Sequence, residues 1–317
     1  MKQAKNLSVV GSAMLVLGLL HGCGGGGTSG GVPMLPLLEG RSSSSGPSSE
    51  RLAGLPATPT DTAKDSSAPV EGSEPAPSLG TPQPGSTAAV GNDSEGVYES
   101  DFGYAHVSAS GKVARQFNGG LLWGSIDISG LNWVFNPGTE YTSMSADPVT
   151  GSGSFSPKAS MDGTYSRGGR SPSAIGPLTY SVANALAVDQ ASVAGTWAIP
   201  DILGIGMSIV VDETGAFTGS TSGFQIGVCK LSGSLMLAQP GSAKNSYVTT
   251  LTAENAATGT EKRCQLLSGM PYVGPSAIVF IPAGKHASNG YFRSVALTIR
   301  QDNTKAFVSN YLLKQKQ

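Results

Sequence analysis

An abrupt change in composition near residue 96 is the feature that most constrains how this chain can fold. Before it, the sequence is dominated by Gly, Ser, Pro, Thr and Ala and has too few large apolar residues to build a core. After it, short runs of β-branched and aromatic residues are separated by glycines. The foldable part of the 317-residue chain is therefore predicted to be residues 96–317, enough for one large domain or two smaller ones.

The first 22 residues have the pattern of a secretory signal peptide. Lys2 and Lys5 precede an apolar run over residues 9–20, and a small residue, Gly22, stands at the end. A positive start, about a dozen apolar residues and a small residue at the cleavage point define such a signal. The run is shorter than the roughly 20 apolar residues of a spanning helix, so a retained transmembrane anchor is the weaker alternative.

The end of this segment, Leu20-His21-Gly22-Cys23, resembles the lipobox of bacterial lipoproteins. The resemblance implies that the peptide is cut before Cys23, that the Cys23 thiol carries diacylglycerol, and that its new amine is acylated, for example with palmitate. Each buried methylene contributes about 0.8 kcal/mol, so two or more chains anchor a protein stably in the bilayer. An ordinary signal peptide with an accidental cysteine is the alternative. Gly24 stands where aspartate would resemble an inner-membrane retention signal, which favours the outer membrane.

Residues 23–95 are predicted to be a lipidated N-terminus followed by a disordered Gly/Ser/Pro-rich linker, because such a composition cannot bury enough apolar surface to offset the entropy of ordering. A random coil of that length spans on the order of 45–50 Å. Two motif matches inside it are rejected. The G-x-G-x-x-G of residues 25–30 and the G-x-S-x-G of residues 27–31 lack the strand before and the helix after that give these motifs their function.

The folded region is predicted to be all-β: an antiparallel β-barrel or sandwich, arranged as one domain or as two β subdomains, 96–190 and 191–317. Alternating apolar and polar residues predict strands, and turn signals separate them about every 8–12 residues. Asp212-Glu213-Thr214-Gly215 predicts a hairpin turn, with glycine at a position that needs a positive φ angle. The expected strands are 121–128, 131–135, 207–211, 216–219, 227–237, 247–253, 276–281, 293–300 and 305–313.

The second half contains a series of short motifs: G-x-W, an apolar strand, D-x-x-G-x-F, a cysteine strand with S-G, N-x-Y and a second cysteine. This pattern is similar to lipocalin-like barrels and to uncharacterised β-barrel lipoproteins of proteobacteria. The resemblance covers about 120 residues and implies a barrel whose G-x-W tryptophan packs across a closed end, rather than a particular function. The strands are too short for a roomy lipocalin cavity. The matching residues are Gly195, Trp197, Asp212, Gly215, Phe217, Cys229, Ser232, Gly233, Asn245, Tyr247 and Cys264.

With Cys23 assigned to lipid, Cys229 and Cys264 are the two remaining cysteines. An even pair in an exported bacterial protein should close into a disulfide because the compartment is oxidising. A bridge over a loop of about 35 residues would stabilise the fold by up to about 4 kcal/mol. A redox or metal site is the alternative, but the spacing is not C-x-x-C and no histidine is near.

The sequence offers little else for catalysis or for holding a metal or cofactor, and none is predicted. After cleavage only His106 and His286 remain, and we expect both to be structural or solvated rather than members of a triad. We expect the tryptophans to pack in the core, with a binding face as the alternative. The carboxylates are scattered singly, mostly near turns where Asp caps the backbone: Asp127, Asp162, Asp201, Asp212 and Glu254.

The function predicted from these features is a non-enzymatic binding module, lipid-anchored at the bacterial outer membrane and facing the periplasm or the cell surface. Charged residues are only 13% of the chain and the net charge is −1, which argues against a nucleic-acid partner. The bilayer, reached through Cys23, is one expected partner, and a protein or glycan is another. A periplasmic structural or envelope-assembly role is the alternative, and a small-molecule carrier is less favoured.

Overall fold

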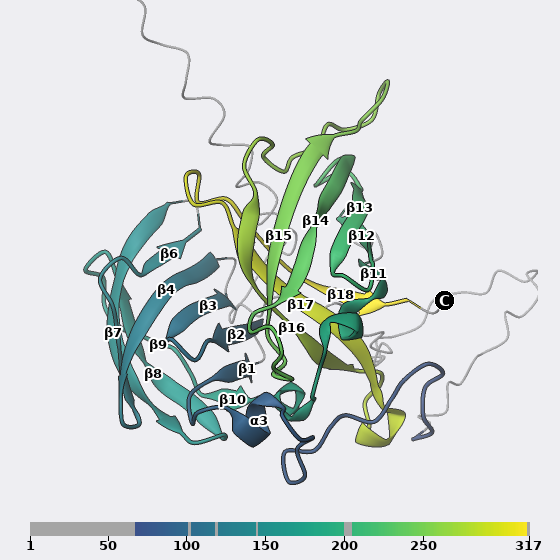
Figure 1. Cartoon of the computed structure of the whole chain (residues 1–317). Coiled ribbons are helices and arrows are strands. Elements are labelled where there is room, and N and C mark those ends of the chain that lie inside the picture. The colour runs from purple at the N-terminus through teal and green to yellow at the C-terminus, as the bar shows by residue number, and fades with distance from the viewer. Residues whose placement is uncertain (1–66, 101–102, 118–119, 144, 200–204, 316–317) are drawn as a thin grey trace, which may run out of the picture.

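The computed structural model describes residues 67–100, 103–117, 120–143, 145–199 and 205–315. They form two closed antiparallel β-barrels that lie side by side (Figure 1). We call them the N-terminal barrel, which holds β1–β10, and the C-terminal barrel, which holds β11–β18. The prediction of an all-β fold is confirmed, and the barrel and two-subdomain alternatives are the ones the chain adopts.

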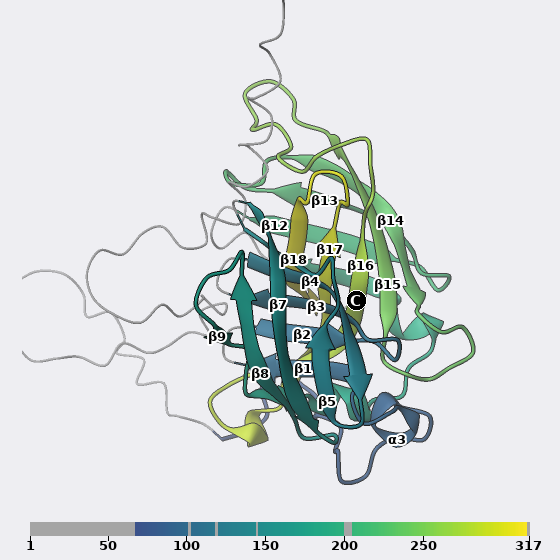
Figure 2. The same cartoon turned by 90° about the vertical axis from the view of Figure 1, so that its left-hand side faces the viewer.

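The N-terminal barrel has eight positions around its circumference, two of which are each filled by a pair of short strands. Both β5 and β6 lie between β4 and β7, and β9 and β10 both pair with β8. The β1–β10 and β7–β8 pairings complete the ring, which Figure 2 shows from its outer side. The strands are β1 (Gly96–Ser100), β2 (Gly103–Val107), β3 (Lys112–Phe117), β4 (Gly120–Ser129), β5 (Asn132–Phe135), β6 (Glu140–Thr142), β7 (Ala146–Ser156), β8 (Ser160–Arg167), β9 (Ser173–Ala174) and β10 (Leu178–Tyr180).

The C-terminal barrel is a simple meander in which each strand pairs with the next and β18 pairs back with β11. The predicted hairpin is present, because Asp212 accepts hydrogen bonds from the backbone of Thr214 and Ala216, and Gly215 has a φ angle of 91°. The strands are β11 (Gly195–Ile199), β12 (Gly206–Val211), β13 (Ala216–Ser222), β14 (Cys229–Leu237), β15 (Tyr247–Asn255), β16 (Tyr272–Pro282), β17 (Tyr291–Arg300) and β18 (Phe307–Lys314).

Each barrel is filled by the side chains that alternate inward along its strands. In β15, for example, Tyr247, Thr249 and Leu251 are buried, whereas Val248 between them is 41% exposed. Large rings occupy both interiors, with Trp133 1% exposed in the N-terminal barrel and Trp197 fully buried in the C-terminal barrel. The core-packing expectation for the tryptophans therefore holds for these two.

Strand β17 is buried on both faces because the N-terminal barrel covers its outer side. Its inward residues, such as Leu297, join the C-terminal core, while its outward residues Ala296 and Thr298 are also fully buried. The Thr298 hydroxyl donates a hydrogen bond of 2.7 Å to the hydroxyl of Tyr104 in β2. At β17 the two barrels are thus packed together with buried side chains on both sides.

The predicted linker boundary at residue 95 is wrong for its last part, because residues 67–95 lie on the barrels in a defined path. Glu74 and Tyr291 exchange two backbone hydrogen bonds of 2.9 and 2.8 Å, and the Glu74 carboxylate forms a bidentate ion pair with Arg293. The chain then makes helix α3 (Thr87–Val90) before entering β1. Composition alone did not reveal this strap, because its order comes from hydrogen bonds to a barrel formed much later in the sequence.

Candidate functional site

A cavity of about 270 Å³ lies between the two barrels. Residues 108–110 of the turn between β2 and β3 supply one wall, and the β14–β15 loop, residues 238–246, supplies the opposite wall. Thr87 of α3 and Glu95, just before β1, complete the lining on the N-terminal side. Because neither barrel forms it alone, this cavity exists only in the assembled pair.

His106 and Ser246 meet across the cavity from different barrels, with 3.1 Å between Nε2 and Oγ. Burial lowers the pKa of His106 to about 4, so its imidazole is neutral at neutral pH. A histidine beside a serine can activate the hydroxyl as a nucleophile, but an imidazole with so low a pKa is a weak general base. The contact joins the two barrels, and the low pKa makes His106 a weak general base there.

A nearly buried ion pair also spans the barrels beside the cavity. The Lys244 ammonium lies 2.8 and 3.1 Å from the two carboxylate oxygens of Glu95, and the two side chains are only 15% and 7% exposed. The charge of each therefore compensates the other. Lys112, at the start of β3, also lines the cavity but is exposed and makes no ion pair with any residue that the structure describes.

Asn245 fixes the loop that carries Lys244 and Ser246. Its amide nitrogen donates to the carbonyl oxygens of Ala183 and Ile278 at 3.0 and 2.7 Å, and its side-chain oxygen accepts from the Ile278 backbone at 2.9 Å. Ala183 belongs to the 3₁₀ helix η2 (Val182–Ala185), which follows β10 of the N-terminal barrel. A buried amide satisfied in this way rigidifies its surroundings, so the wall of the cavity is preorganised.

A second polar network crosses the interface away from the cavity. The Ser309 hydroxyl of β18 lies 3.1 Å from the Thr298 hydroxyl and donates to the Gln116 side-chain oxygen of β3 at 2.9 Å. Burial raises the pKa of Tyr104, which also contacts Thr298, so this phenol remains protonated. Nearby, Arg300 pairs with Glu140 of β6 at 3.0 Å.

Trp123 is the exception among the tryptophans. It is half-buried in β4 rather than packed inside a barrel, and the guanidinium of Arg300 lies 5.1 Å from its ring centroid. This is a cation–π contact across the interface between the barrels. The ring thus packs against the other barrel instead of forming a free binding face.

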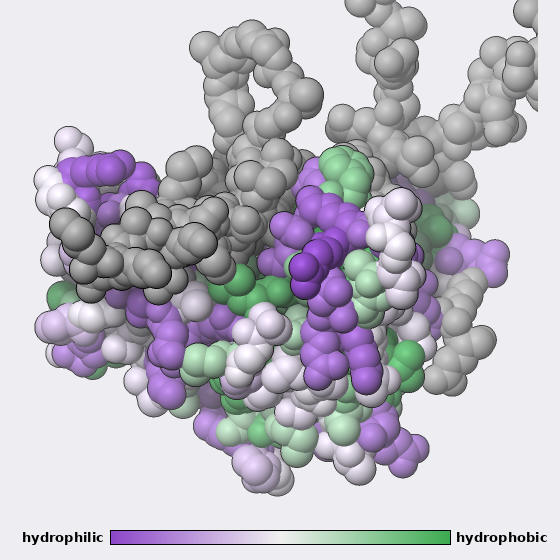
Figure 3. Space-filling view, turned by 90° about the horizontal axis from the view of Figure 1, so that it is seen from above, coloured by the Kyte–Doolittle hydropathy of each residue, from purple (hydrophilic) through white to green (hydrophobic). Residues whose placement is uncertain are grey.

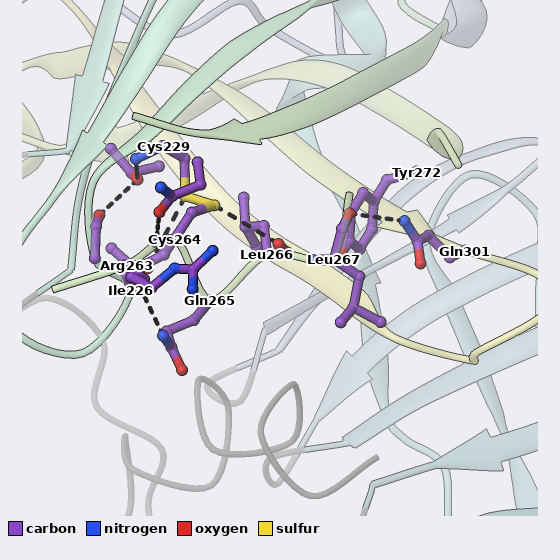
Figure 4. Close-up of a disulfide and its surroundings, with 12 residues drawn as sticks. Ile226, Cys229, Arg263, Cys264, Gln265, Leu266, Leu267, Tyr272 and Gln301 are labelled. Atoms are coloured by element: carbon purple, nitrogen blue, oxygen red, sulfur yellow. Dashed lines mark hydrogen bonds between the residues drawn. A yellow bond between two sulfur atoms is a disulfide. The ribbon is translucent and has the colours of Figure 1, made fainter. Parts of the chain in front are cut away.

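The predicted disulfide between Cys229 and Cys264 is confirmed (Figure 4). It joins the start of β14 to the long β15–β16 connection, and Gln265 N donates to Ile226 O at 2.9 Å beside it. Leu267 N in the same connection donates to the Tyr272 hydroxyl at 2.9 Å. These bonds hold an otherwise irregular segment against the barrel.

The disulfide lies at the end of the C-terminal barrel opposite the β14–β15 loop, since consecutive strands of a meander run in opposite directions. The face seen from above in Figure 3 carries small apolar areas among hydrophilic and intermediate residues. Phe224, in the β13–β14 connection, is 71% exposed. Side chains from both barrels converge at the cavity, which is the candidate site.

The tryptophan of the G-x-W motif, Trp197, is buried in the C-terminal barrel. The Trp197 indole donates to the Val193 carbonyl at 2.7 Å, and Val193 ends the 3₁₀ helix η3 (Gln190–Val193). The Tyr247 hydroxyl donates to Asp189 O at 2.8 Å, directly before η3. The buried Trp197 ring and Tyr247 are thus both hydrogen-bonded to the segment that holds η3.

The other predicted site residues do not come together. Cys23 and the two rejected glycine motifs lie outside the described residues. His286 lies in the β16–β17 loop, and Asp212 caps the β12–β13 turn, where hydrogen bonds from Thr214 lower the pKa of its carboxyl. Among the residues that the structure describes, no three His, Cys, Asp or Glu side chains are grouped to hold a metal ion. No helix in the same part of the chain is long and apolar enough to cross a membrane.

Sequence reasoning missed Glu95, Lys112, Lys244 and Ser246 as parts of a site. Ser246 is the middle residue of the N-x-Y pattern, so its neighbours drew attention while it did not. Its partner His106 is 140 residues away in sequence, and no local pattern signals such a contact.

Comparison of the chain with protein-family models, curated proteins and solved structures found no match.

Proposed function

We propose that this protein is a non-enzymatic binding module, lipid-anchored through Cys23 at the outer membrane of a bacterium, which binds its partner at the cavity between its barrels. The observation that supports it most is the cavity itself, because ligand sites form preferentially where two domains meet. A protein or glycan of the envelope or its surroundings is the expected partner.

The Cys229–Cys264 disulfide supports the proposed location. Disulfides form and persist outside the cytoplasm, in compartments such as the bacterial periplasm. Together with the signal-like residues 1–22, this favours export. The lipid anchor rests on the resemblance of residues 20–23 to a lipobox.

The packed interiors favour a surface site over a carrier function inside a barrel. The C-terminal barrel encloses Trp197, Tyr247 and Tyr272, each at most 1% exposed, so large rings already occupy its centre. The low pKa of His106 weighs against acid–base catalysis at the one place where a histidine and a serine meet in the described cavity.

Protease shaving of intact cells tests where the protein acts. With lysed cells and a periplasmic marker as controls, loss of the barrels from intact cells would support a surface module. Protection until lysis would move the search to periplasmic partners and favour an assembly role. Metabolic palmitate labelling of the native chain, absent from Cys23→Ser, is expected if the anchor is correct; equal labelling of both would contradict it.

Site-specific cross-linking tests whether the cavity binds. A photo-reactive residue at Ser110, which is exposed and lines the cavity, should give adducts in living cells, whereas the same group at Val210, on the exposed wall of β12, should not. Equal adducts at both positions, or none at either, would contradict a binding site at the cavity.

A further inference from the structure

We propose that the inter-barrel cavity takes a ligand bearing a small oxyanion, such as a phosphate ester, which Lys112 and the hydroxyl groups of the β2–β3 turn hold. This inference rests on the proposed binding function, since it names the ligand class for the same cavity. It does not depend on the side of the outer membrane at which the protein acts.

The charges of the lining favour an anion. Lys112 and Lys244 are its two cations and Glu95 is its carboxylate, and the bidentate pair with Lys244 already neutralises Glu95. His106 adds no charge because its pKa is about 4. One positive charge, that of Lys112, is left without a partner among the described residues.

The hydrogen-bonding groups of the lining favour a ligand that accepts. Ser108 and Ser110, in the β2–β3 turn, place their hydroxyl oxygens 3.1 Å apart, and Ser108 Oγ also accepts from Lys112 N at 3.0 Å. Thr87 Oγ1 accepts from Asn245 N at 3.2 Å, which leaves the Thr87 hydroxyl proton to be donated. An ammonium group and hydroxyl donors close together match the acceptor oxygens of phosphate, sulfate or carboxylate.

The dimensions of the cavity limit what can carry the anion. Its volume of about 270 Å³ is just below the roughly 300–1,000 Å³ of pockets for drug-sized ligands. A free anion, a simple phosphate ester or one headgroup of a lipid is therefore a better fit than an extended chain. Val248 lines the cavity and is 41% exposed, so the cavity opens to solvent beside it.

Titration of the purified full-length protein in detergent tests the proposal. Inorganic phosphate and methyl phosphate should bind. Binding would be measured by calorimetry and by shifts of the imidazole NMR signals of His106, which lines the cavity. Lys112→Ala should weaken binding at least tenfold, whereas Lys230→Ala, an exposed lysine on the outer face of β14, should leave it unchanged. Binding should also weaken as salt concentration rises.

Two outcomes would overturn the proposal: no binding of either anion at millimolar concentration, or equal weakening by Lys112→Ala and Lys230→Ala. Vesicles of phosphatidylglycerol, compared with neutral phosphatidylcholine vesicles, distinguish a lipid headgroup from a soluble ester as the source of the anion. Cross-linking from Ser110 without anion binding would contradict the anion as ligand but leave the proposed binding function intact. Anion binding without cellular adducts would instead count against the proposed envelope partner.

Discussion

At the scale of single residues, burial sets the chemistry of the interface. His106 is 5% exposed and packed between the barrels, where it reaches the hydroxyl of Ser246. The cost of burying a charge is what depresses its pKa. His106 is thus held between the barrels as a neutral hydrogen-bonding group.

The stability of the protein should depend on pH through His106. Its pKa is about 6.5 in the unfolded chain and about 4 in the folded one, so between these values only the unfolded state binds the proton. The free energy of unfolding should therefore fall by up to about 3 kcal/mol as the pH drops from 6.5 to 4. Urea unfolding across this range should show a flatter pH dependence in His106→Gln; parallel curves for both proteins would refute the assignment.

Two facing glycines make room for Trp133 in the N-terminal barrel. Gly153 in β7 pairs directly with Gly163 in β8, and a Cβ atom at either would lie about 2.5 Å from the Trp133 ring. Because the ring is 1% exposed, it cannot move aside into solvent. Gly163→Ala should cost about 1–3 kcal/mol through overpacking.

Near-UV circular dichroism and thermal unfolding would measure this effect. Gly80→Ala is the matched control, because a Cβ there has only Ser78 Oγ nearby, at an ordinary 3.5 Å. Equal melting temperatures for the Gly163 and Gly80 variants would show that the barrel can absorb the added methyl group.

At the scale of elements, two irregular segments, the β15–β16 connection and the strap, are held against the barrels by specific bonds rather than by packing. The β15–β16 connection and residues 67–86 of the strap are poor in buried apolar side chains, so neither can hold its shape by packing alone. One is fixed by the Cys229–Cys264 bond and the other by backbone hydrogen bonds and the Glu74–Arg293 ion pair. Irregular segments in this protein are thus attached to the barrels by specific bonds.

Removing the disulfide should destabilise the C-terminal barrel. The bridge closes a loop with a sequence separation of 35, for which the loop-entropy model gives up to about 4 kcal/mol. The double variant Cys229→Ser, Cys264→Ser should unfold at lower urea than the native chain, and a reducing agent should lower the native midpoint but not that of the variant. A variant as stable as the oxidised native protein would contradict this role.

At the scale of the whole molecule, the two barrels should behave as one cooperative unit. The interface buries the outer face of β17, including Ala296, which pairs with Tyr311 of β18. Tyr311 contacts Tyr104 of the other barrel with 5.3 Å between ring centroids. Separating the barrels would expose this apolar surface together with buried hydroxyl groups.

A charge placed in this interface should uncouple the barrels. We expect one calorimetric transition for the native protein and two for Ala296→Arg, because an unpaired guanidinium cannot be buried there. Val210→Arg, on the 55% exposed outer wall of β12, should retain a single transition. Two transitions in the native protein would show that the interface is weaker than its burial implies.

The sequence by itself determined the all-β fold class and some of its elements, whereas most of the ten strands of the N-terminal barrel were not predicted. Alternation placed most strands of the C-terminal barrel, the Asp212–Gly215 turn indicated the β12–β13 hairpin, and cysteine number with the expected export indicated the disulfide. The strands and the turn depend on residues that are close in sequence. The disulfide could be predicted because only two cysteines remained to pair.

The tertiary structure alone decided the cavity, the strap and the double burial of β17. Glu95 meets Lys244 across 149 residues, Glu74 meets Arg293 across 219, and His106 meets Ser246 across 140. Such contacts depend on how two closed barrels pack against each other, and the outward faces that form the interface look in sequence like ordinary solvent-facing positions. A site built between barrels therefore leaves no local pattern for sequence analysis to find.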